Sequence, residues 1–552
     1  METKILDGDT FKRMLEGGAE EIQAQVEEIN ELNVFPVPDG DTGTNMMKTM
    51  ESGIAKIPDT HDASVGEVAT AFAKGTLLGA RGNSGVILSQ FLAGVGEALS
   101  DKETVTAQEF ADAYLDGVKR AYAAVSKPVE GTMLTVFRES AEYVKRKLDE
   151  NSTVEDVLRL NIKEAKRSLE RTKEILPVLA EADVVDSGGA GYLCIATGMY
   201  EALIGKARAF EKISTEAKPA PQVDYDLFTT DSTLEFGYCT ECLVRLMRAK
   251  GDPEAFDLAA FTASLEAADC NSIVALRDGD VLKVHAHTVT PSVILTLCQQ
   301  YGEFLNIKIE NMSLQHSEKA ATQQKPKKMP HKHYGVVAVA NGEGMSALFA
   351  GLGADVVIDG GQTDNPSTED FINAFSALDV DHIFVLPNNG NILLTAGQAA
   401  ELWEKGNVTV VPTKTLPQGY AALSVFNASV TDPEEQLSDM IDAKSAVVSG
   451  EVTVAIRDAS IGGVQVKEGE SIGILDGTLV CACPSVPDAL CEMIEKIEDV
   501  EDREILTLFV GKDADEEESA EIAQLIEDRF DWLTVETVIG GQRVYRYLIA
   551  VE

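Results

Sequence analysis

The chain has 552 residues, of which 44% are hydrophobic and 25% are charged. This length exceeds what one hydrophobic core supports, so we expect about two to four globular domains. Lysine and arginine number 47 against 91 aspartate and glutamate, which gives a formal net charge of −44. So acidic a surface repels phosphates and argues against nucleic acid as a partner. Any nucleotide site must therefore supply local positive charge, and a bound divalent cation is the simplest source of it.

The N-terminus and the cysteine content predict a cytoplasmic protein. The first residues, from Met1 to Asp7, turn acidic at once, unlike a signal peptide. No run approaches the roughly 18 apolar residues of a membrane span, so we expect no integral membrane segment. Eight cysteines in a chain this long form no dense disulfide pattern, which favours a reducing compartment.

Residues 1–212 are predicted to form an all-helical domain. Apolar residues recur at three- and four-residue spacing from Phe11 to Ile29, which is typical of a helix with one buried face. Capping-box patterns, which mark helix starts, begin at Ser64, Thr106 and Ser152.

The rest of the chain is predicted to form two further domains. After a first linker near residues 218–222, residues 225–316 mix strands and helices, with a hairpin turn at 277–280. Residues 317–333 form a basic linker, which we interpret as a solvated tether. In residues 334–552, strands and helices first alternate, as in a parallel α/β sheet, and a second lobe begins near residue 450. The predicted fold class is multidomain, with all-α, α+β and two-lobed α/β domains in that order.

The strongest local pattern is an acidic loop that runs from Asn33 to Asn45. Asp39 and Asp41 are two residues apart, so both carboxylates can converge on one cation, and Gly40 and Gly43 permit sharp bends. Hard oxygen ligands of this kind suit Mg²⁺ together with phosphate oxygens.

The same loop also fits two alternatives to a magnesium site. It can be an acidic surface turn with Asp41 or Thr42 as helix N-cap, which is the commoner outcome for the five residues 39–43 taken alone. A calcium loop also uses Asp-x-Asp-x-x-Gly, but the glutamate expected at position 12 is replaced by Met50.

Three glycine-containing turns accompany the acidic loop, and each precedes an apolar run. A glycine turn that opens a helix presents backbone N–H groups to phosphate, although many such turns merely cap helices. No Walker sequence, kinase glycine loop or dinucleotide fingerprint is present. The three turns are Gly79 to Gly85, Lys127 to Leu134 and Asp186 to Gly191.

These four segments, in this order, resemble the nucleotide-binding subunit of phosphotransferase-dependent dihydroxyacetone kinase over about residues 8–210. With segments further along, the chain is similar over nearly its full length to the bacterial fatty acid kinase ATP-binding subunit. Those further segments are Phe236 to Glu241, His285 to Thr288, Gly360 to Thr363 and Leu386 to Asn389.

The resemblance implies a helical barrel with ATP in its mouth, and a DegV-like C-terminal domain that recognises a partner. It implies that Asp39 and Asp41 are the catalytic pair and hold two Mg²⁺ ions. Asn33 lies near the position at which the family has a further aspartate ligand. Here the residue is an amide, and its separation from Asp39 is one residue longer. The other implied ATP contacts are Thr42, Asn45, Asn83, Ser84 and Gly85 at the phosphates, and Thr132, Met133, Asp186 and Gly188 on the adenine and ribose side.

A zinc site is predicted in the middle domain. Cys239 and Cys242 are spaced Cys-x-x-Cys, and His285 and His287 alternate on one strand, so both imidazoles can reach one metal. Spacing alone supports two interpretations about equally. One is a zinc site, and the other is a set of buried cysteines and strand histidines that are unrelated to each other. The resemblance implies a structural Zn²⁺ at Cys239, His285 and His287, completed by Cys242, His316 or water.

The function implied by the resemblance is that of a homodimeric kinase subunit. It would form an acyl phosphate from ATP and a fatty acid carried by a separate DegV-like fatty-acid-binding protein. The alternatives are a dihydroxyacetone-type kinase, which needs a substrate-binding histidine in a separate domain, and a nucleotide-sensing scaffold without catalysis. Composition predicts that the loops after Gly360 and Leu386 are turns, with Ser367 as a helix cap, while the resemblance makes them candidates for the partner surface.

Overall fold

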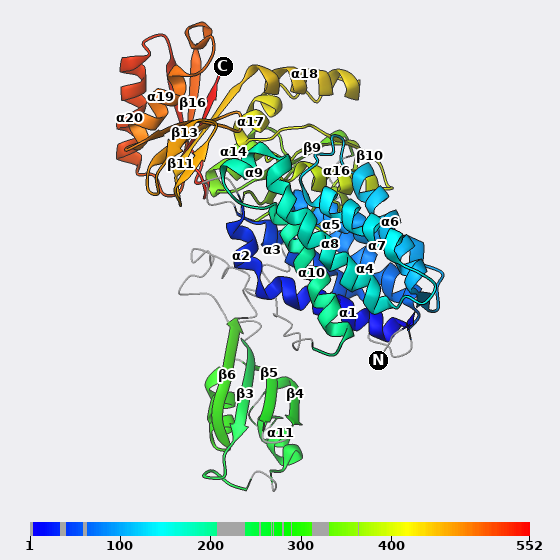
Figure 1. Ribbon diagram of the computed structural model, residues 1–552. Coiled ribbons are helices and arrows are strands. Elements are labelled where there is room, and N and C mark those ends of the chain that lie inside the picture. Colours follow the sequence, from blue (N-terminus) through cyan, green and yellow to red (C-terminus); the bar gives the residue numbers. More distant parts are fainter. Residues whose placement is uncertain are drawn as a thin grey trace. The chain divides into compact units, whose positions relative to one another are not determined.

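The computed structural model (Figure 1) describes most of the chain. The described residues are 4–33, 40–58, 63–206, 238–252, 256–266, 268, 270–278, 281–288, 290–311, 331–362 and 364–552. The chain divides into two compact units, one of residues 1–212 with 330–552 and the other of residues 213–329. The predicted multidomain class is confirmed, because all-helical, α+β and α/β regions follow one another along the chain. The predicted linker near residues 218–222 lies outside the described residues, and so do residues 317–330 of the linker predicted over 317–333. The last two residues of that linker instead belong to strand β7 (Lys332–Ala340).

The N-terminal region is helical, as predicted, apart from one pair of very short antiparallel strands, β1 (Ile5–Leu6) and β2 (Val105–Thr106). The helices are α1 (Gly8–Ala24), α2 (Val26–Glu31), α3 (Thr42–Lys56), α4 (Val65–Gly79), α5 (Gly82–Leu99), α6 (Ala107–Ala123), α7 (Met133–Lys147), α8 (Val154–Ile175), α9 (Pro177–Glu181) and α10 (Ser187–Leu203).

Two of the three predicted capping boxes are confirmed, and the third is displaced by one residue. Ser64 and Thr106 each cap a helix reciprocally with the glutamate three residues later. At α8 the capping pair is Thr153 with Asp156. Ser152 instead donates to Asp149 Oδ1 at 3.0 Å. Both Ser152 and Thr153 are followed by an acid three residues later, so the pattern alone does not select between them.

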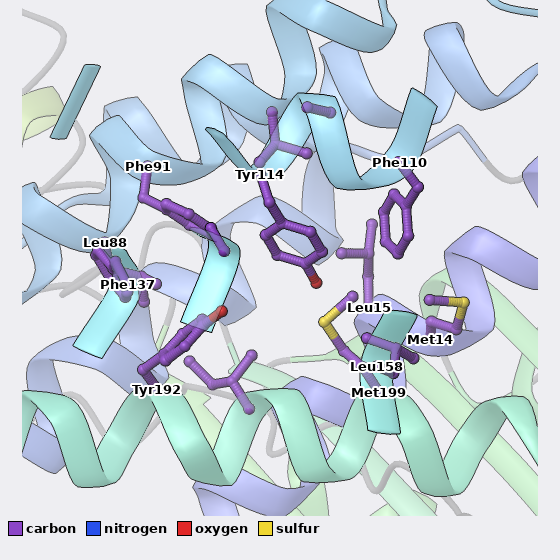
Figure 2. Close-up of a cluster of buried hydrophobic side chains, with 14 of the residues drawn as sticks. Met14, Leu15, Leu88, Phe91, Phe110, Tyr114, Phe137, Leu158, Tyr192 and Met199 are labelled. Atoms are coloured by element: carbon purple, nitrogen blue, oxygen red, sulfur yellow. The ribbon is translucent and has the colours of Figure 1, made fainter. Parts of the chain in front are cut away.

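The core of the helical region is rich in aromatic side chains. Figure 2 shows Phe91, Phe137 and Tyr192 close together between the helices. The Phe91 and Phe137 rings stack at a centroid distance of 4.5 Å, and Tyr192 meets Phe137 edge to face at 4.6 Å. These side chains are buried, and Tyr192 places its hydroxyl on Asn161 Oδ1 at 3.0 Å. The helices therefore surround one apolar interior, which keeps a small cavity of about 20 Å³ lined in part by Phe91, Tyr114 and Tyr192.

The first lobe of the C-terminal region is a parallel sheet in the order β10-β9-β7-β8. This confirms the α/β arrangement predicted from the alternation of strands and helices. Its elements are β7 (Lys332–Ala340), α14 (Glu343–Leu352), β8 (Val356–Asp359), α15 (Thr368–Ser376), β9 (Val380–Leu386), α16 (Leu393–Leu402), β10 (Asn407–Val410), α17 (Leu416–Ser424) and α18 (Pro433–Ala446).

The second lobe is built on a mixed sheet in the order β15-β14-β11-β18-β16-β17, in which β16 and β17 are parallel. The elements are β11 (Val448–Val454), β12 (Ala459–Ile461), β13 (Val464–Val466), β14 (Ser471–Leu475), β15 (Thr478–Cys483), α19 (Val486–Glu495), the 3₁₀ turn Val500–Asp502, β16 (Ile505–Val510), α20 (Glu516–Arg529), β17 (Thr534–Ile539) and β18 (Tyr547–Val551).

Hydrogen bonds join the helical and C-terminal regions within the first unit. Helix α16 packs on α5, and α15 packs on α4. Gln398 of α16 donates to the Leu77 carbonyl at 2.7 Å and accepts from Gln90 Nε2 at 2.7 Å. These contacts place the loop between β8 and α15 beside the start of α5.

The second unit is an antiparallel sheet in the order β4-β5-β3-β6, with the buried faces of two helices against it. The predicted hairpin is confirmed by the pairing of β4 with β5, although its turn residues 279 and 280 lie outside the described residues. The elements are β3 (Tyr238–Leu246), α11 (Leu258–Glu266), β4 (Asn271–Asp278), β5 (Val281–Thr288), α12 (Pro291–Gln299) and β6 (Gly302–Asn311).

Two further findings concern the described residues as a whole. None of their helices combines the length and the apolar character needed to cross a bilayer. The cysteine side chains that are described, which do not include that of Cys239, are buried and form no disulfide with one another.

Candidate functional site

Asp41 stands directly before α3, and its carboxylate is not used to cap that helix. The residue occupies the N-cap position, but its side chain forms no capping hydrogen bond. Asn30 takes that role, because its Oδ1 accepts from the Gly43 N–H at 2.8 Å and from the Thr44 N–H at 3.3 Å. Asp41 is only 8% exposed. A buried carboxylate at a helix start that performs no capping role suits ligand binding better than it suits an acidic surface turn.

The glycine turn before α5 lies against the start of α3. Gly82 has a φ of +56°, and a Cβ there would lie 2.5 Å from Asn45 Nδ2. At Gly85, a Cβ would lie 2.5 Å from the Thr49 hydroxyl. Glycine at these two positions therefore lets α5 begin beside Asn45, one turn beyond Asp41.

The first turn of α5 presents backbone donors, as the glycine pattern predicts. Arg81, its N-cap residue, forms no side-chain capping hydrogen bond. Ser84 and Gly85 lie in this first turn, whereas Asn83 is turned to the C-terminal region, where it donates to Asn391 Oδ1 at 3.4 Å. The start of α5 can therefore receive an anion.

Three hydroxyl and amide groups connect the start of α3 to the start of α10. Thr42 and Ser187 both donate to Asn33 Oδ1, each at 3.1 Å, and Ser187 also donates to Thr42 Oγ1 at 3.2 Å. Asn33 is therefore engaged as an acceptor for two hydroxyls. Ser187 is absent from the predicted contacts, although it lies inside the predicted glycine turn.

The residues predicted for the adenine and ribose side also come together. The Asp186 carboxylate caps α10 by accepting from the Gly189 N–H at 2.7 Å, and it accepts from the Met133 N–H at the start of α7. A Cβ on Gly188 would lie 3.0 Å from Met133 Sδ. Thr132, the N-cap residue of α7, places its hydroxyl on the Val129 carbonyl at 2.7 Å.

The starts of α3, α5, α7 and α10 thus meet at one end of the helical region. Their aligned peptide dipoles favour negative charge there, as phosphates require. Lys48 and Arg81 lie beside this end, but they pair with Asp364 at 3.4 Å and with Asp370 at 3.7 Å along an open groove. The local attraction for an anion therefore comes from the helix starts, and a cation on Asp41 would add to it.

Two metal predictions are not tested by this geometry. Asp39, the other proposed magnesium ligand, lies outside the described residues, and so do the side chains of Cys239, His285 and His287. Within the part of the chain that is described, no group of three or more His, Cys, Asp and Glu side chains is arranged to hold a metal. The proposed alternative ligand Cys242 lies in the hydrophobic core with Cys298. It is three residues from Cys239, and that separation places strand residues on opposite faces.

The loops after Gly360 and Leu386 bury their asparagine side chains against their own chain, although Asp364 lies on the open groove. Asn365, Asn388 and Asn389 are buried. Ser367 caps α15 together with Asp370, which confirms the predicted turn chemistry. In this arrangement these amides are not exposed to a partner.

The buried carboxyl group of Asp186 should make the stability of the fold depend on pH. Burial raises its carboxyl pKa from 3.8 to about 6, although hydrogen bonds from Gly189 and Met133 lower it in part. The folded state therefore holds this proton more tightly than the unfolded chain, so the group stabilises the fold most below about pH 4, and this contribution is lost as pH rises through about 6.

Between about pH 5 and pH 8, the free energy of unfolding of the wild type should fall by roughly 1 to 2 kcal/mol more than that of Asp186→Asn. Urea titrations of both proteins measure the difference. An equal change in the free energy of unfolding of both proteins over this pH range would contradict the raised pKa of Asp186.

Comparison with protein families assigns all three regions of the chain. Residues 36–201 match the DAK2 domain. Residues 235–319 match the middle domain of the FakA-like fatty acid kinase proteins, and residues 335–552 match their C-terminal domain. The site at the starts of the four helices lies mostly within the DAK2 match.

Relatives align with this chain from end to end. Protein YloV of Bacillus subtilis is 40% identical over 568 residues, covering 100% of both chains. An uncharacterized protein of Staphylococcus saprophyticus is 38% identical over 563 residues, and one of Staphylococcus aureus is 37% identical over 562 residues, each covering 99% of both chains.

Two solved structures align with parts of the chain at low similarity. One is the dihydroxyacetone kinase from C. freundii in complex with AMP-PNP and Mg²⁺, at 15% identity and a TM-score of 0.27, covering 35% of this chain and 33% of that one. The other is DegV, a fatty acid binding protein from Bacillus subtilis, at 13% identity and a TM-score of 0.30, covering 40% of this chain and 99% of that one. From the family matches and the full-length relatives, the chain belongs to the FakA-like fatty acid kinase family.

Proposed function

We propose that this chain is the ATP-binding catalytic subunit of a fatty acid kinase. Its substrate is a fatty acid carboxylate held by a separate DegV-like fatty-acid-binding protein, and its products are acyl phosphate and ADP. Membership of the FakA-like fatty acid kinase family and the DAK2 match support a kinase. The observation that carries the proposal is the buried Asp41 carboxylate, which stands at the start of α3 without capping that helix.

The residues at this end fit a magnesium-bound nucleotide. Asp41 offers a hard anionic oxygen, and Asp39 is proposed as its companion. A buried carboxylate beside helix starts is stabilised by their dipoles, and it attracts a divalent cation. Bound Mg²⁺ supplies charge neutralisation on the phosphates.

The proposed roles of the other residues follow from where they lie. Ser84, in the first turn of α5, donates to phosphate oxygens, and Gly85, whose N–H donates to the Arg81 carbonyl at 3.1 Å, lets them approach closely. Thr42 and Asn45 stand beside them on α3 and orient the phosphate chain. Met133, Asp186 and Gly188 line the side that receives the sugar and base.

The chemistry requires little from protein acids or bases. A fatty acid carboxylate is ionised at neutral pH, so its oxygen attacks the γ-phosphorus without a general base. The bond between the γ-phosphorus and the bridging oxygen breaks, and ADP leaves with the electron pair. Catalysis then consists of alignment and charge stabilisation.

The experiment that tests this function is acyl-phosphate formation by the purified full chain. We expect ATP-dependent trapping of the product as a hydroxamate when Mg²⁺ and a fatty-acid-loaded binding protein are both supplied. ADP release without acyl phosphate would favour a different acceptor, and nucleotide binding without turnover would favour a sensing scaffold.

We also propose that the middle domain holds a structural Zn²⁺ at Cys239, His285 and His287. The support is the backbone register, which pairs Cys239 of β3 with His287 of β5, two residues from His285. Antiparallel partners that lie directly opposite share one face of the sheet.

Metal analysis of the purified full chain should find about one zinc per chain, as expected for one tetrahedral site. Cys239→Ser should release it, whereas Cys270→Ser, which changes a thiol in the hydrophobic core, should retain it. A wild-type chain without zinc would end this proposal.

The proposed homodimer has one structural observation in its favour. Leu305, Ile307 and Ile309 are more than 40% exposed on β6, which is the last strand of the described sheet. An apolar row on an edge strand is typical of a surface that another chain covers. A second copy of this chain is the occupant we propose.

A further inference from the structure

A loop of the C-terminal region reaches the candidate phosphoryl-transfer site. The loop lies between β8 and α15, and it docks on the turn before α5 by backbone contacts. Ser367 forms a β-bridge with Arg81, and the Thr368 N–H donates to the Ala80 carbonyl at 3.2 Å. Arg81 in turn donates to the Asn365 carbonyl at 2.7 Å.

Asn365, at the tip of this loop, contacts the carboxylate on which the proposed function depends. Its side-chain amide donates to Asp41 Oδ2. A Cβ on Gly82 would lie 3.3 Å from the Asn365 amide nitrogen and 2.5 Å from that of Asn45. Glycine at position 82 thus gives both amides room beside Asp41.

The side-chain carbonyl oxygen of Asn365 accepts no hydrogen bond from the described residues. The residue is 2% exposed, and its Oδ1 has no hydrogen-bond partner among the described residues. A buried carbonyl oxygen without a donor is costly, so its retention beside a carboxylate calls for an explanation. Amide oxygens accept readily from metal-bound water, and they also coordinate hard cations.

We propose that Asn365 is a positioning residue supplied by the C-terminal region to the nucleotide site. Its N–H groups fix the orientation of the Asp41 carboxylate, and its Oδ1 accepts a hydrogen bond from water on the bound cation. Partners that orient a ligating carboxylate tune metal affinity strongly. This inference rests on the proposed function, and it makes the helical site depend on the C-terminal region of the same chain.

The test is a Mg²⁺ titration of AMP-PNP binding to the full chain, measured by calorimetry. Asn365→Ala should raise the Mg²⁺ concentration for half-saturation by about 10- to 100-fold. The matched control is Gln398→Ala, because Gln398 is also a buried amide, 5% exposed, that joins the same two regions without contacting Asp41. Gln398→Ala should lower the melting temperature and leave the Mg²⁺ requirement within about threefold of the wild type.

A second variant separates positioning from simple packing. Asn365→Asp places a second carboxylate against Asp41, so its melting temperature should fall without Mg²⁺ and recover when Mg²⁺ is added. Two results would overturn the positioning role without affecting the proposed function. One is an Asn365→Ala protein with the Mg²⁺ requirement of the wild type, and the other is a Mg²⁺ requirement that rises equally in Asn365→Ala and Gln398→Ala. Absence of Mg²⁺-dependent nucleotide binding by the wild type would overturn the proposed function and this inference together.

Discussion

Replacement of Asp41 by asparagine is expected to lower kcat for acyl-phosphate formation by about 100- to 1,000-fold, the usual effect of losing one preorganised charge-stabilising group. The change removes the negative charge that attracts the cation but keeps the size of the side chain. The new carbonyl oxygen still accepts from Asn365, and α3 keeps the cap supplied by Asn30. The fold should therefore survive, with the free energy of unfolding within about 0.5 kcal/mol of the wild type.

Asn30→Ala is the complementary control for this variant. It removes the acceptor of the Gly43 and Thr44 N–H groups, so it should cost about 1 kcal/mol of stability while the Asp41 charge remains. Steady-state kinetics with the fatty-acid-binding protein present, together with urea denaturation, distinguish the two effects. Full turnover by Asp41→Asn would remove Asp41 from the mechanism.

The largest expected effect on stability is that of Phe91→Ala, at about 3 to 5 kcal/mol. Phe91 is 2% exposed, and its ring contacts Phe137, Tyr114 and Tyr192 in the core seen in Figure 2. Its removal leaves a cavity that the surrounding rings cannot fill without moving. Because Phe91 lies on α5, the change should also disturb the glycine turn that opens this helix.

Denaturant titration of the full chain, followed by far-UV circular dichroism, measures the loss from the helical transition. Ile175→Ala is the matched control, since Ile175 is an apolar helical residue that is 41% exposed, and it should cost less than about 1 kcal/mol. A loss below about 1 kcal/mol for Phe91→Ala would contradict the burial of this ring in the apolar core.

Local patterns predicted much of the fold because they depend only on neighbouring residues. The sequence also predicts a helix at about Glu516 to Arg529 in the second lobe, and α20 has these bounds, with three acidic residues in its first turn. The short strands β12 to β15 and helix α19 are absent from the prediction. Strands as short as Val464–Val466 are too brief to show a period, and β14 is buried along most of its length, so it lacks alternation.

Local patterns predicted each segment of the candidate site, and only the family resemblance grouped the four segments together. Asp41, Thr42 and Asn45 belong to one loop and one helix turn, and the glycine turns carry the groups that join them. Asn365 lies 324 residues from Asp41, and no local pattern links the two. Asn30 and Ser187 act through tertiary hydrogen bonds, and their residue types alone do not reveal these partners.

The central claim is that ATP phosphates bind where α3, α5, α7 and α10 begin, with a metal ion held by Asp41. A crystal structure of the full chain with AMP-PNP and Mn²⁺ tests it most directly, because anomalous scattering locates the metal. We predict an anomalous peak within coordination distance of an Asp41 carboxylate oxygen, about 2.1 Å, with phosphate oxygens at the first turn of α5. Nucleotide and metal bound elsewhere, for example in the pocket lined by Gly361, Asn388 and Tyr545, with Asp41 still against Asn365, would contradict the account.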